Sequence, residues 1–251
     1  MTLRRSLADD FAAAGLDWIV PEWPAPSNVQ AFSTTRNRGP AGRRSPTGEA
    51  SDDDPTDELE RWVPAPPRWL RQVHGATVHD ADESAAAASP PRADGIVTRS
   101  CDLVCVIQTA DCLPVLLADR SGSVVAAAHA GWRGLAAGVI EATLAAMRAD
   151  PGDVLAWIGP AIGPRAYEVG ADVLEAHRAA DSGADECFVS IGPDKWLADL
   201  RALARRRLAR AGVRSVAGEA RCTFTESALF HSYRRDGARA GRMVTLIWRS
   251  P

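Results

Sequence analysis

Four short apolar runs follow one another closely in the middle of the chain, and they restrict the fold more than any other feature. Each run is typical of a buried strand. They are Leu103–Thr109, Val115–Asp119, Val124–His129 and Val154–Ile158. Between the last two, apolar residues recur at helical spacing from Leu135 to about Arg148. Strands and helices that interleave in this way indicate a mixed α/β or α+β fold.

Further elements are predicted in the C-terminal part of the chain. Asp172, followed three residues later by Glu175, matches a capping box that opens a helix toward Ala180. A second helix is predicted from the spacing of Leu197, Leu200, Ala204 and Leu208, and Val244 to Trp248 resembles a closing strand. The segment 37–67 lacks an apolar period and is rich in Gly, Pro, Ser and Asp, so it predicts an irregular exposed loop.

Charge and cysteine usage exclude several classes of partner. The 251 residues carry a formal net charge of -3, which gives no basic footprint for nucleic acid. No apolar run is long enough for a membrane helix, and Asp9 and Asp10 interrupt any signal-peptide core, so we expect a cytoplasmic protein without a membrane partner. The five cysteines, an odd number, also suit a reducing compartment. P-loop, Rossmann, hydrolase-elbow and zincin motifs are absent from the sequence.

Three residues that can bind a metal remain, each in a suggestive position. His74 precedes a glycine, Cys112 follows an apolar strand, and His129 ends the next strand but one. Two imidazoles and one thiolate suit zinc, and three protein ligands leave its fourth position open for water or substrate. The spacing matches no short metal motif, so ordinary polar side chains remain the alternative. His79, His177 and His231 have poorer contexts, and we expect them to be structural.

Arg133 gives a separate hint of an anion site. It falls in the first turn of the helix predicted near Leu135, where a cation opposes the helix dipole. A bound phosphate would explain this placement, because helix amides and a guanidinium together can hold it. The alternative is a surface arginine whose side chain bends away into solvent.

Several motifs together resemble one known family. The motifs are Arg71-Gln72-Val73-His74-Gly75, Ala93-Asp94-Gly95, Thr109-Ala110-Asp111-Cys112-Leu113-Pro114-Val115, His129-Ala130-Gly131-Trp132-Arg133-Gly134, Gly159-Pro160-Ala161-Ile162-Gly163-Pro164, Tyr167-Glu168-Val169-Gly170, Ser232-Tyr233-Arg234-Arg235-Asp236-Gly237 and Gly241-Arg242-Met243. Taken in order along the chain, they closely resemble the YfiH-like family, also called laccase-domain or multicopper polyphenol oxidase proteins and, in bacteria, peptidoglycan editing factor.

The resemblance implies an α+β fold in which mixed sheets pack face to face with helices outside, as one domain over residues 1–251. It also implies a zinc site made by His74, Cys112 and His129. Its implied activity is phosphorolysis of adenosine, inosine and methylthioadenosine to the free base and (methylthio)ribose 1-phosphate, with adenosine deamination besides. The implied partners are therefore purine nucleosides and phosphate.

Specific roles follow from that chemistry as hypotheses. Arg36 and Arg133 are candidates for binding phosphate, and Asp111 for positioning or relaying a proton beside the metal ligand Cys112. Asp111 could equally orient the metal site. The sequence departs from the family after Arg36, where Asn37-Arg38-Gly39-Pro40-Ala41-Gly42 replaces a Gly-Gly-x-Ser turn and an Asn-bearing segment, which affects the expected substrate range.

Three other functions stay open. A multicopper oxidase needs many imidazoles, and five histidines cannot supply them, so a copper-dependent polyphenol oxidase would have to use one copper at the same His/Cys/His site. A metal-free hydrolase with Cys112 as nucleophile and His129 as base would suit editing of peptidoglycan precursors. A zinc-stabilised binding module would bind without turnover.

Overall fold

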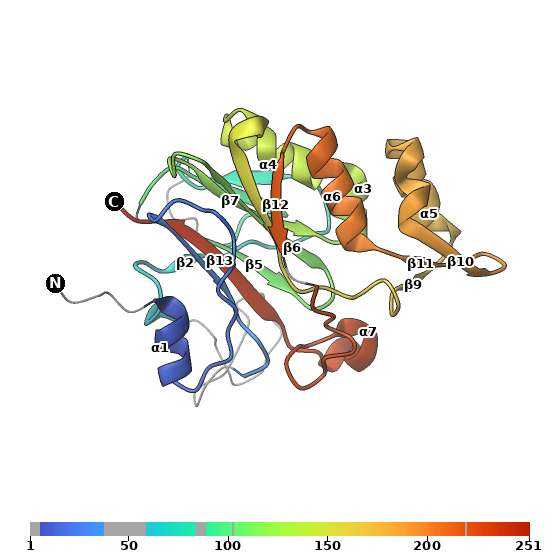
Figure 1. Cartoon of the computed structure of the whole chain (residues 1–251), viewed down its shortest axis with the longest axis horizontal. Coiled ribbons are helices and arrows are strands. Elements are labelled where there is room, and N and C mark those ends of the chain that lie inside the picture. The colour runs from blue at the N-terminus through green and yellow to red at the C-terminus, as the bar shows by residue number, and fades with distance from the viewer. Residues whose placement is uncertain (1–5, 38–58, 84–88, 102, 219) are drawn as a thin grey trace.

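The strands of the protein form three sheets (Figure 1) within residues 6–37, 59–83, 89–101, 103–218 and 220–251, which the computed structural model describes. The six-stranded sheet, in the order β12-β8-β6-β7-β4-β3, consists of Ser215–Gly218, Val154–Ile158, Leu113–Asp119, Val125–Ala130, Gly95–Thr98 and Val78–Asp80. The four-stranded sheet, β1-β13-β5-β2, consists of Val29–Ser33, Met243–Arg249, Val104–Thr109 and Pro67–Arg68. A smaller sheet, β10-β11-β9, consists of Phe188–Gly192, Lys195–Ala198 and Glu168–Val169.

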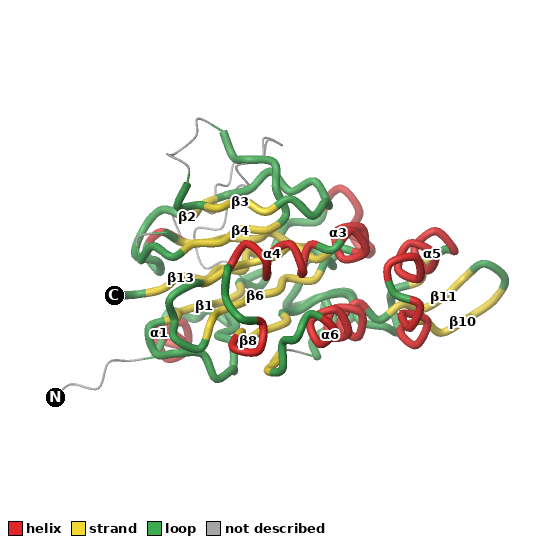
Figure 2. Tube along the Cα trace, turned by 90° about the horizontal axis from the view of Figure 1, so that it is seen from above, coloured by secondary structure: helices red, strands yellow, loops and turns green. Residues whose placement is uncertain are grey.

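The two larger sheets pack face to face, with helices on both outer faces (Figure 1). Seen from above, the helices of one face lie over the six-stranded sheet (Figure 2). Helices α3 (Trp132–Ala137), α4 (Val139–Met147) and α6 (Leu200–Arg210) cover the six-stranded sheet, and α1 (Leu7–Ala13) covers the four-stranded sheet. Helix α5 (Ala171–Ala180) packs beside the small sheet, and the short α7 spans Tyr233–Asp236. This order of layers confirms the predicted fold class.

The alternation of side chains along the strands explains the layers. In β6, Val115 and Leu117 face the core under the helices, whereas Leu116 and Ala118 face the core between the sheets. Successive residues of a strand point to opposite faces, so a continuously apolar strand packs on both sides. All seven residues of β6 are buried accordingly.

The four strands predicted in the middle of the chain are present as β5 to β8, and β8 has the predicted bounds. The closing strand is β13, which lies between β1 and β5. No helix in the described part of the chain is long and apolar enough to cross a lipid bilayer.

The helix predicted from Leu135 to Arg148 is wrong in its extent. The chain forms two helices that meet at Gly138, which ends α3 with a left-handed φ of 91°. Arg133 is therefore the second residue of a six-residue helix that begins at Trp132. The dipole argument for an anion at Arg133 is weak for so short a helix, because the macrodipole sums over aligned peptides.

Two other helix starts also differ from prediction. Helix α5 begins after Gly170, and no side chain caps it, so the capping box assigned to Asp172 does not form. Leu197 lies in strand β11, and α6 begins after Asp199, whose carboxylate accepts hydrogen bonds from two backbone amides of the first turn. The segment after Arg36 in which the sequence departs from the resembled family lies outside the described residues, except for Asn37.

Most of the predicted loop at 37–67 also lies outside the described residues, but its C-terminal end packs firmly. Leu59 is 2% exposed in the core beneath α1, and the ring of Trp62 lies 4.9 Å from that of Phe11. Because the facing sheets share one core and the outer cores adjoin it, we propose that the chain forms a single domain.

A buried histidine makes stability depend on pH. The side chain of His177 in α5 is 2% exposed, and its Nε2 has no hydrogen-bond partner among the described residues. Burial, together with the charge of Arg207, lowers its pKa to about 4. The unfolded chain therefore binds a proton here at a higher pH than the folded chain, so acid lowers the free energy of unfolding.

We expect this histidine to cost about 2–3 kcal/mol of stability between roughly pH 7.5 and pH 4.5. The measurement is urea unfolding of the wild type and of His177→Leu at both pH values. The variant should lose correspondingly less stability on acidification than the wild type. Parallel losses in the two proteins would contradict the expectation.

Candidate active site

His74, Cys112 and His129 come together although they lie far apart in the sequence. Their ligand atoms all lie within 4.8 Å of one another, and the two imidazole centroids are 4.8 Å apart. His74 lies in the loop between β2 and β3, Cys112 directly precedes β6, and His129 is in β7. Strands β6 and β7 pair so that Pro114 opposes His129, which brings Cys112 near that imidazole. We call these three residues the His/Cys/His group.

The turn that carries Cys112 joins the two large sheets. Strand β5 ends at Thr109 in one sheet, and β6 starts at Leu113 in the other. Asp111 makes this sharp passage with a left-handed φ of 86°. Such a conformation is costly for a residue with a side chain, so it persists only where surrounding contacts hold it.

Contacts to the C-terminal segment hold Asp111 in place. Its carboxylate accepts hydrogen bonds from Thr223 Oγ1 at 2.6 Å, Ser232 Oγ at 3.0 Å and the backbone amide of Arg234 at 2.7 Å. Both oxygens are thus engaged. These contacts favour a positional role over the proton relay considered from the sequence.

Asp94 is a site residue that sequence reasoning did not single out. Its side chain is fully buried and accepts hydrogen bonds from the backbone amides of Val73, His74 and Gly75. Its Oδ1 also lies 2.8 Å from His129 Nδ1. The only signal in the sequence was its place in an Ala-Asp-Gly motif of the resembled family.

The proximity of these groups changes their pKa values. Burial opposes ionisation of the Cys112 thiol, but His129 and His74 beside it outweigh burial and lower the pKa of the thiol. Burial likewise opposes protonation of His129, yet Cys112 and Asp94 raise its pKa. A thiol that ionises readily is suited to metal binding, because the thiolate is the ligand.

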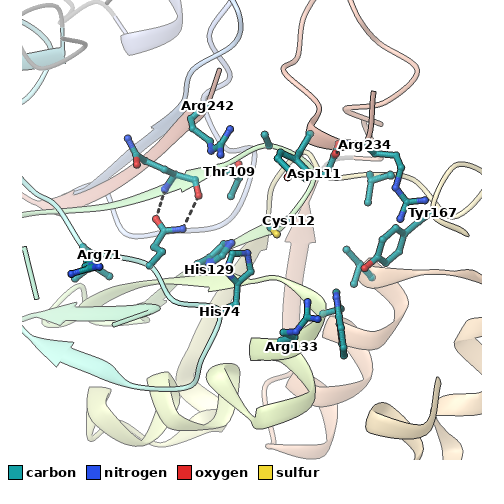
Figure 3. A pocket seen from close by; sticks show the side chains of 18 residues that line it. Arg71, His74, Thr109, Asp111, Cys112, His129, Arg133, Tyr167, Arg234 and Arg242 are labelled. Carbon is teal, nitrogen blue, oxygen red and sulfur yellow. Dashed lines mark hydrogen bonds between the residues drawn. The ribbon is translucent and has the colours of Figure 1, made fainter. Parts of the chain in front are cut away.

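A cavity of about 710 Å³ opens over the His/Cys/His group (Figure 3). Four arginines line it around that group, namely Arg71, Arg133, Arg234 and Arg242. The one carboxylate among the lining residues is Asp111, which is already hydrogen-bonded. The cavity is therefore positively charged and suits an anion.

Of the two arginines predicted to bind phosphate, one lines the cavity and the other does not. Arg133 lines the cavity, with its guanidinium 4.1 Å from the centroid of the Trp132 ring, and it forms no ion pair within the described part of the chain. Arg36 does not line the cavity. Its Nη1 donates to the carbonyl of Ser227 and lies 3.8 Å from a carboxylate oxygen of Asp236.

The remaining histidines stay apart from the group. His79 is in β3, His177 is in α5, and the backbone amide of His231 donates to the sulfur of Met243. Within the residues that the structure describes, His74, Cys112 and His129 are the one cluster of three or more His, Cys, Asp or Glu side chains suited to a metal ion.

The residues of the group fit a zinc ion. They offer the nitrogen and sulfur donors that zinc prefers, and three ligands leave one position free. His129 is 3% exposed, whereas Cys112 is half-buried and His74 is exposed, so the group faces the cavity.

Gly131 allows the ligands to approach one another. A Cβ atom at this position would lie 2.8 Å from Cys112 Sγ and 3.2 Å from His74 Cδ2. We expect Gly131→Ala to weaken zinc binding about 10-fold, because overpacking costs about 1–3 kcal/mol. Competition with a chromogenic chelator measures this.

The control for that experiment is Gly152→Ala, at the other end of β8 from the cavity, where the added methyl meets the ends of two side chains, Asp150 Oδ1 at 3.2 Å and Arg214 Cζ at 4.0 Å. Unchanged zinc affinity in Gly131→Ala would contradict the close packing of the site.

Comparisons with known proteins cover nearly the whole chain. The family described as multi-copper polyphenol oxidoreductase laccase matches residues 56–250. A purine nucleoside phosphorylase of Pseudomonas aeruginosa is 46% identical over 245 residues, which cover 92% of this chain and 98% of that protein. Purine nucleoside phosphorylase YfiH of Escherichia coli is 46% identical over 241 residues, with the same coverage.

Solved structures agree with this relationship. A Neisseria meningitidis protein superposes with a TM-score of 0.83 at 42% identity, covering 94% of this chain and all of that one. YlmD from Geobacillus stearothermophilus superposes with a TM-score of 0.75 at 28% identity, covering 91% and 94% of the two chains.

Proposed function

The chain belongs to the multi-copper polyphenol oxidoreductase laccase family, which includes YfiH, and we propose that it is a purine nucleoside phosphorylase. The observation that carries the proposal is the positively charged cavity over the His/Cys/His group, in a chain 46% identical to two phosphorylases. Its substrates would be adenosine, inosine and methylthioadenosine, with adenosine deamination as a second activity.

Phosphorolysis requires a phosphate oxygen to bond to C1′ of the ribose while the bond from C1′ to the purine breaks. The electron pair of that bond goes to the base, which takes up a proton. The cavity must therefore hold a dianion beside the ribose and stabilise the departing base. Its volume of about 710 Å³ lies in the range of small-molecule sites.

Arg133 is the residue that we assign to phosphate. Its guanidinium faces the cavity without a carboxylate partner among the described residues, and stacking on Trp132 holds it in place. A guanidinium binds phosphate through paired hydrogen bonds. Arg36 was the other candidate, and its contacts with Ser227 and Asp236 support a different role, namely holding the segment that carries Arg234.

The base would lie near the His/Cys/His group. A metal ion held by this group would supply Lewis acidity at that wall of the cavity. Tyr167 also lines the cavity, and burial raises the pKa of its phenol, so the hydroxyl remains a hydrogen-bond donor at neutral pH. Arg234 lies over the Tyr167 ring at 5.3 Å and donates to the carbonyl of Glu168, which fixes both side chains.

The test is a nucleoside panel with and without phosphate, analysed by chromatography, on protein purified without added metal. We expect free base and ribose 1-phosphate only when phosphate is present, and inosine from adenosine in either case. Zinc and copper content is measured on the same sample. Nucleosides that stay intact in the presence of phosphate would contradict the proposal.

A second candidate is a metal-free hydrolase, and one contact favours it. Asp94 bonds to Nδ1 of His129, and His129 lies beside Cys112, so the three resemble a cysteine nucleophile with its base and orienting carboxylate. Peptidoglycan precursors would be the substrates. Metal content separates the two candidates, because a thiolate bound to zinc is a poor free nucleophile. Stoichiometric copper with phenol oxidation would instead support the oxidase.

A further inference from the structure

Both histidines of the His/Cys/His group are connected to one buried carboxylate. We propose that Asp94 is a positioning residue that fixes His74 and His129 as metal ligands, one through its backbone and the other through its ring. This inference rests on the metal site of the proposed function. It assigns to Asp94 no contact with substrate.

The connection to His74 is through the backbone. His74 has a left-handed φ of 59°, an unfavourable conformation for a residue that carries a side chain. Asp94 accepts the amide of His74 at 2.9 Å, and the amides of Val73 and Gly75 at 3.1 and 2.7 Å. Three donors that converge on one carboxylate hold the loop in this conformation. The His74 ring consequently stays beside Cys112.

The connection to His129 is through the imidazole. Both oxygens of the Asp94 carboxylate accept backbone amides, so this group is the acceptor, and the Nδ1 of His129, 2.8 Å from Oδ1, carries the hydrogen. The lone pair of Nε2 is then left for the metal. An outer carboxylate that fixes tautomer and ring orientation in this way is a recurrent feature of metal sites.

The backbone of Asp94 is itself held on both sides. Its amide donates to the carbonyl of Thr77 at 2.9 Å, and its carbonyl accepts the amide of His129 at 2.7 Å. The backbone that carries this carboxylate is therefore held in place between β3 and β7. Full burial keeps water from competing for its oxygens.

Asp119 offers a matched control for a purely structural carboxylate. It is 8% exposed and accepts hydrogen bonds from the amides of Ser121 and Val124 and from the Ser123 hydroxyl. It ends β6, the strand that Cys112 precedes, so it lies at the opposite end from the cavity. Its loss should loosen a loop without reaching the metal site.

The experiment compares zinc affinity and the cobalt(II) absorption spectrum in Asp94→Asn, Asp119→Asn and the wild type. Oδ1 of Asp94 accepts from the His74 amide and the imidazole, and Oδ2 accepts from the Gly75 amide. An asparagine has a single acceptor oxygen, so its NH2 group would face one of these two sets of donors. We expect Asp94→Asn to bind zinc about 10- to 100-fold more weakly and to change the cobalt spectrum. Asp119→Asn should lower the melting temperature while affinity and spectrum stay unchanged. Wild-type affinity and spectrum in Asp94→Asn would overturn the proposal.

A measurement on the wild type alone decides the matter if Asp94→Asn does not fold. Nitrogen-15 NMR of the zinc-loaded protein should show His129 protonated at Nδ1 and unprotonated at Nε2. The opposite tautomer, or a wild type that binds no zinc, would overturn the proposal. Absence of phosphorolysis, with zinc bound and this tautomer present, would contradict the proposed function and leave the role of Asp94 intact.

Discussion

Cys112→Ala should remove zinc binding and reduce phosphorolysis more than about 100-fold, because changes around a ligand alone already cost 10- to 100-fold. Cys112 supplies the only sulfur of the His/Cys/His group. Deamination should disappear as well, since both activities are proposed to depend on the metal. The measurements are zinc content and the formation of free base and inosine from adenosine.

Cys101→Ala is the matched control. Cys101 is also a free, half-buried cysteine, but it precedes β5, at the opposite end of that strand from the turn that carries Cys112. It should keep zinc and both activities. Full phosphorolysis by Cys112→Ala would remove the metal from the mechanism.

Arg133→Ala should weaken phosphate use by about 10- to 150-fold, the range that corresponds to loss of a charged hydrogen bond of roughly 1.5–3 kcal/mol. Phosphate is a substrate of phosphorolysis only, and deamination consumes water, so inosine formation should change much less. The expected effect is a higher KM for phosphate. Ribose 1-phosphate and inosine are measured from adenosine across a range of phosphate concentrations.

The control here is Arg120→Ala, which removes an exposed arginine just after the end of β6 that is remote from Cys112. It should leave both products unchanged. Equal losses of ribose 1-phosphate and inosine in Arg133→Ala would mean that Arg133 shapes the cavity and does not bind phosphate.

The strands that pack on both faces were predictable, because their apolar runs are continuous. β5, β6 and β7 begin and end within two residues of the predicted bounds. The break at Gly138 was not predictable from spacing, since apolar residues keep the same helical period on both sides of it. The two-residue strands β2 and β9 have no local pattern, and only pairing with distant neighbours creates them.

In the site, too, residues in local motifs were predictable from the sequence, and residues placed by distant contacts were not. The family resemblance drawn from its motifs is confirmed, and the three ligand-type residues were found because each ends a strand or adjoins a glycine. The Asp94 carboxylate accepts hydrogen bonds from backbone amides about twenty positions earlier in the chain, and no rule based on residue spacing predicts such a contact. Arg234 lines the cavity because the Asp111 carboxylate accepts a hydrogen bond from its backbone amide, and these two residues are 123 positions apart in the sequence.

The position of β13 has a consequence for the order of folding. Among the described strands it is the last in sequence, yet it pairs with both β1 and β5 in the middle of the four-stranded sheet. That sheet cannot close until segments from opposite ends of the chain have met, a slow kind of contact for a folding protein. The turn with Asp111 and Cys112 leaves this sheet, so metal-binding competence should arise late, after β13 has inserted, and not with the earlier pairing of β6 and β7.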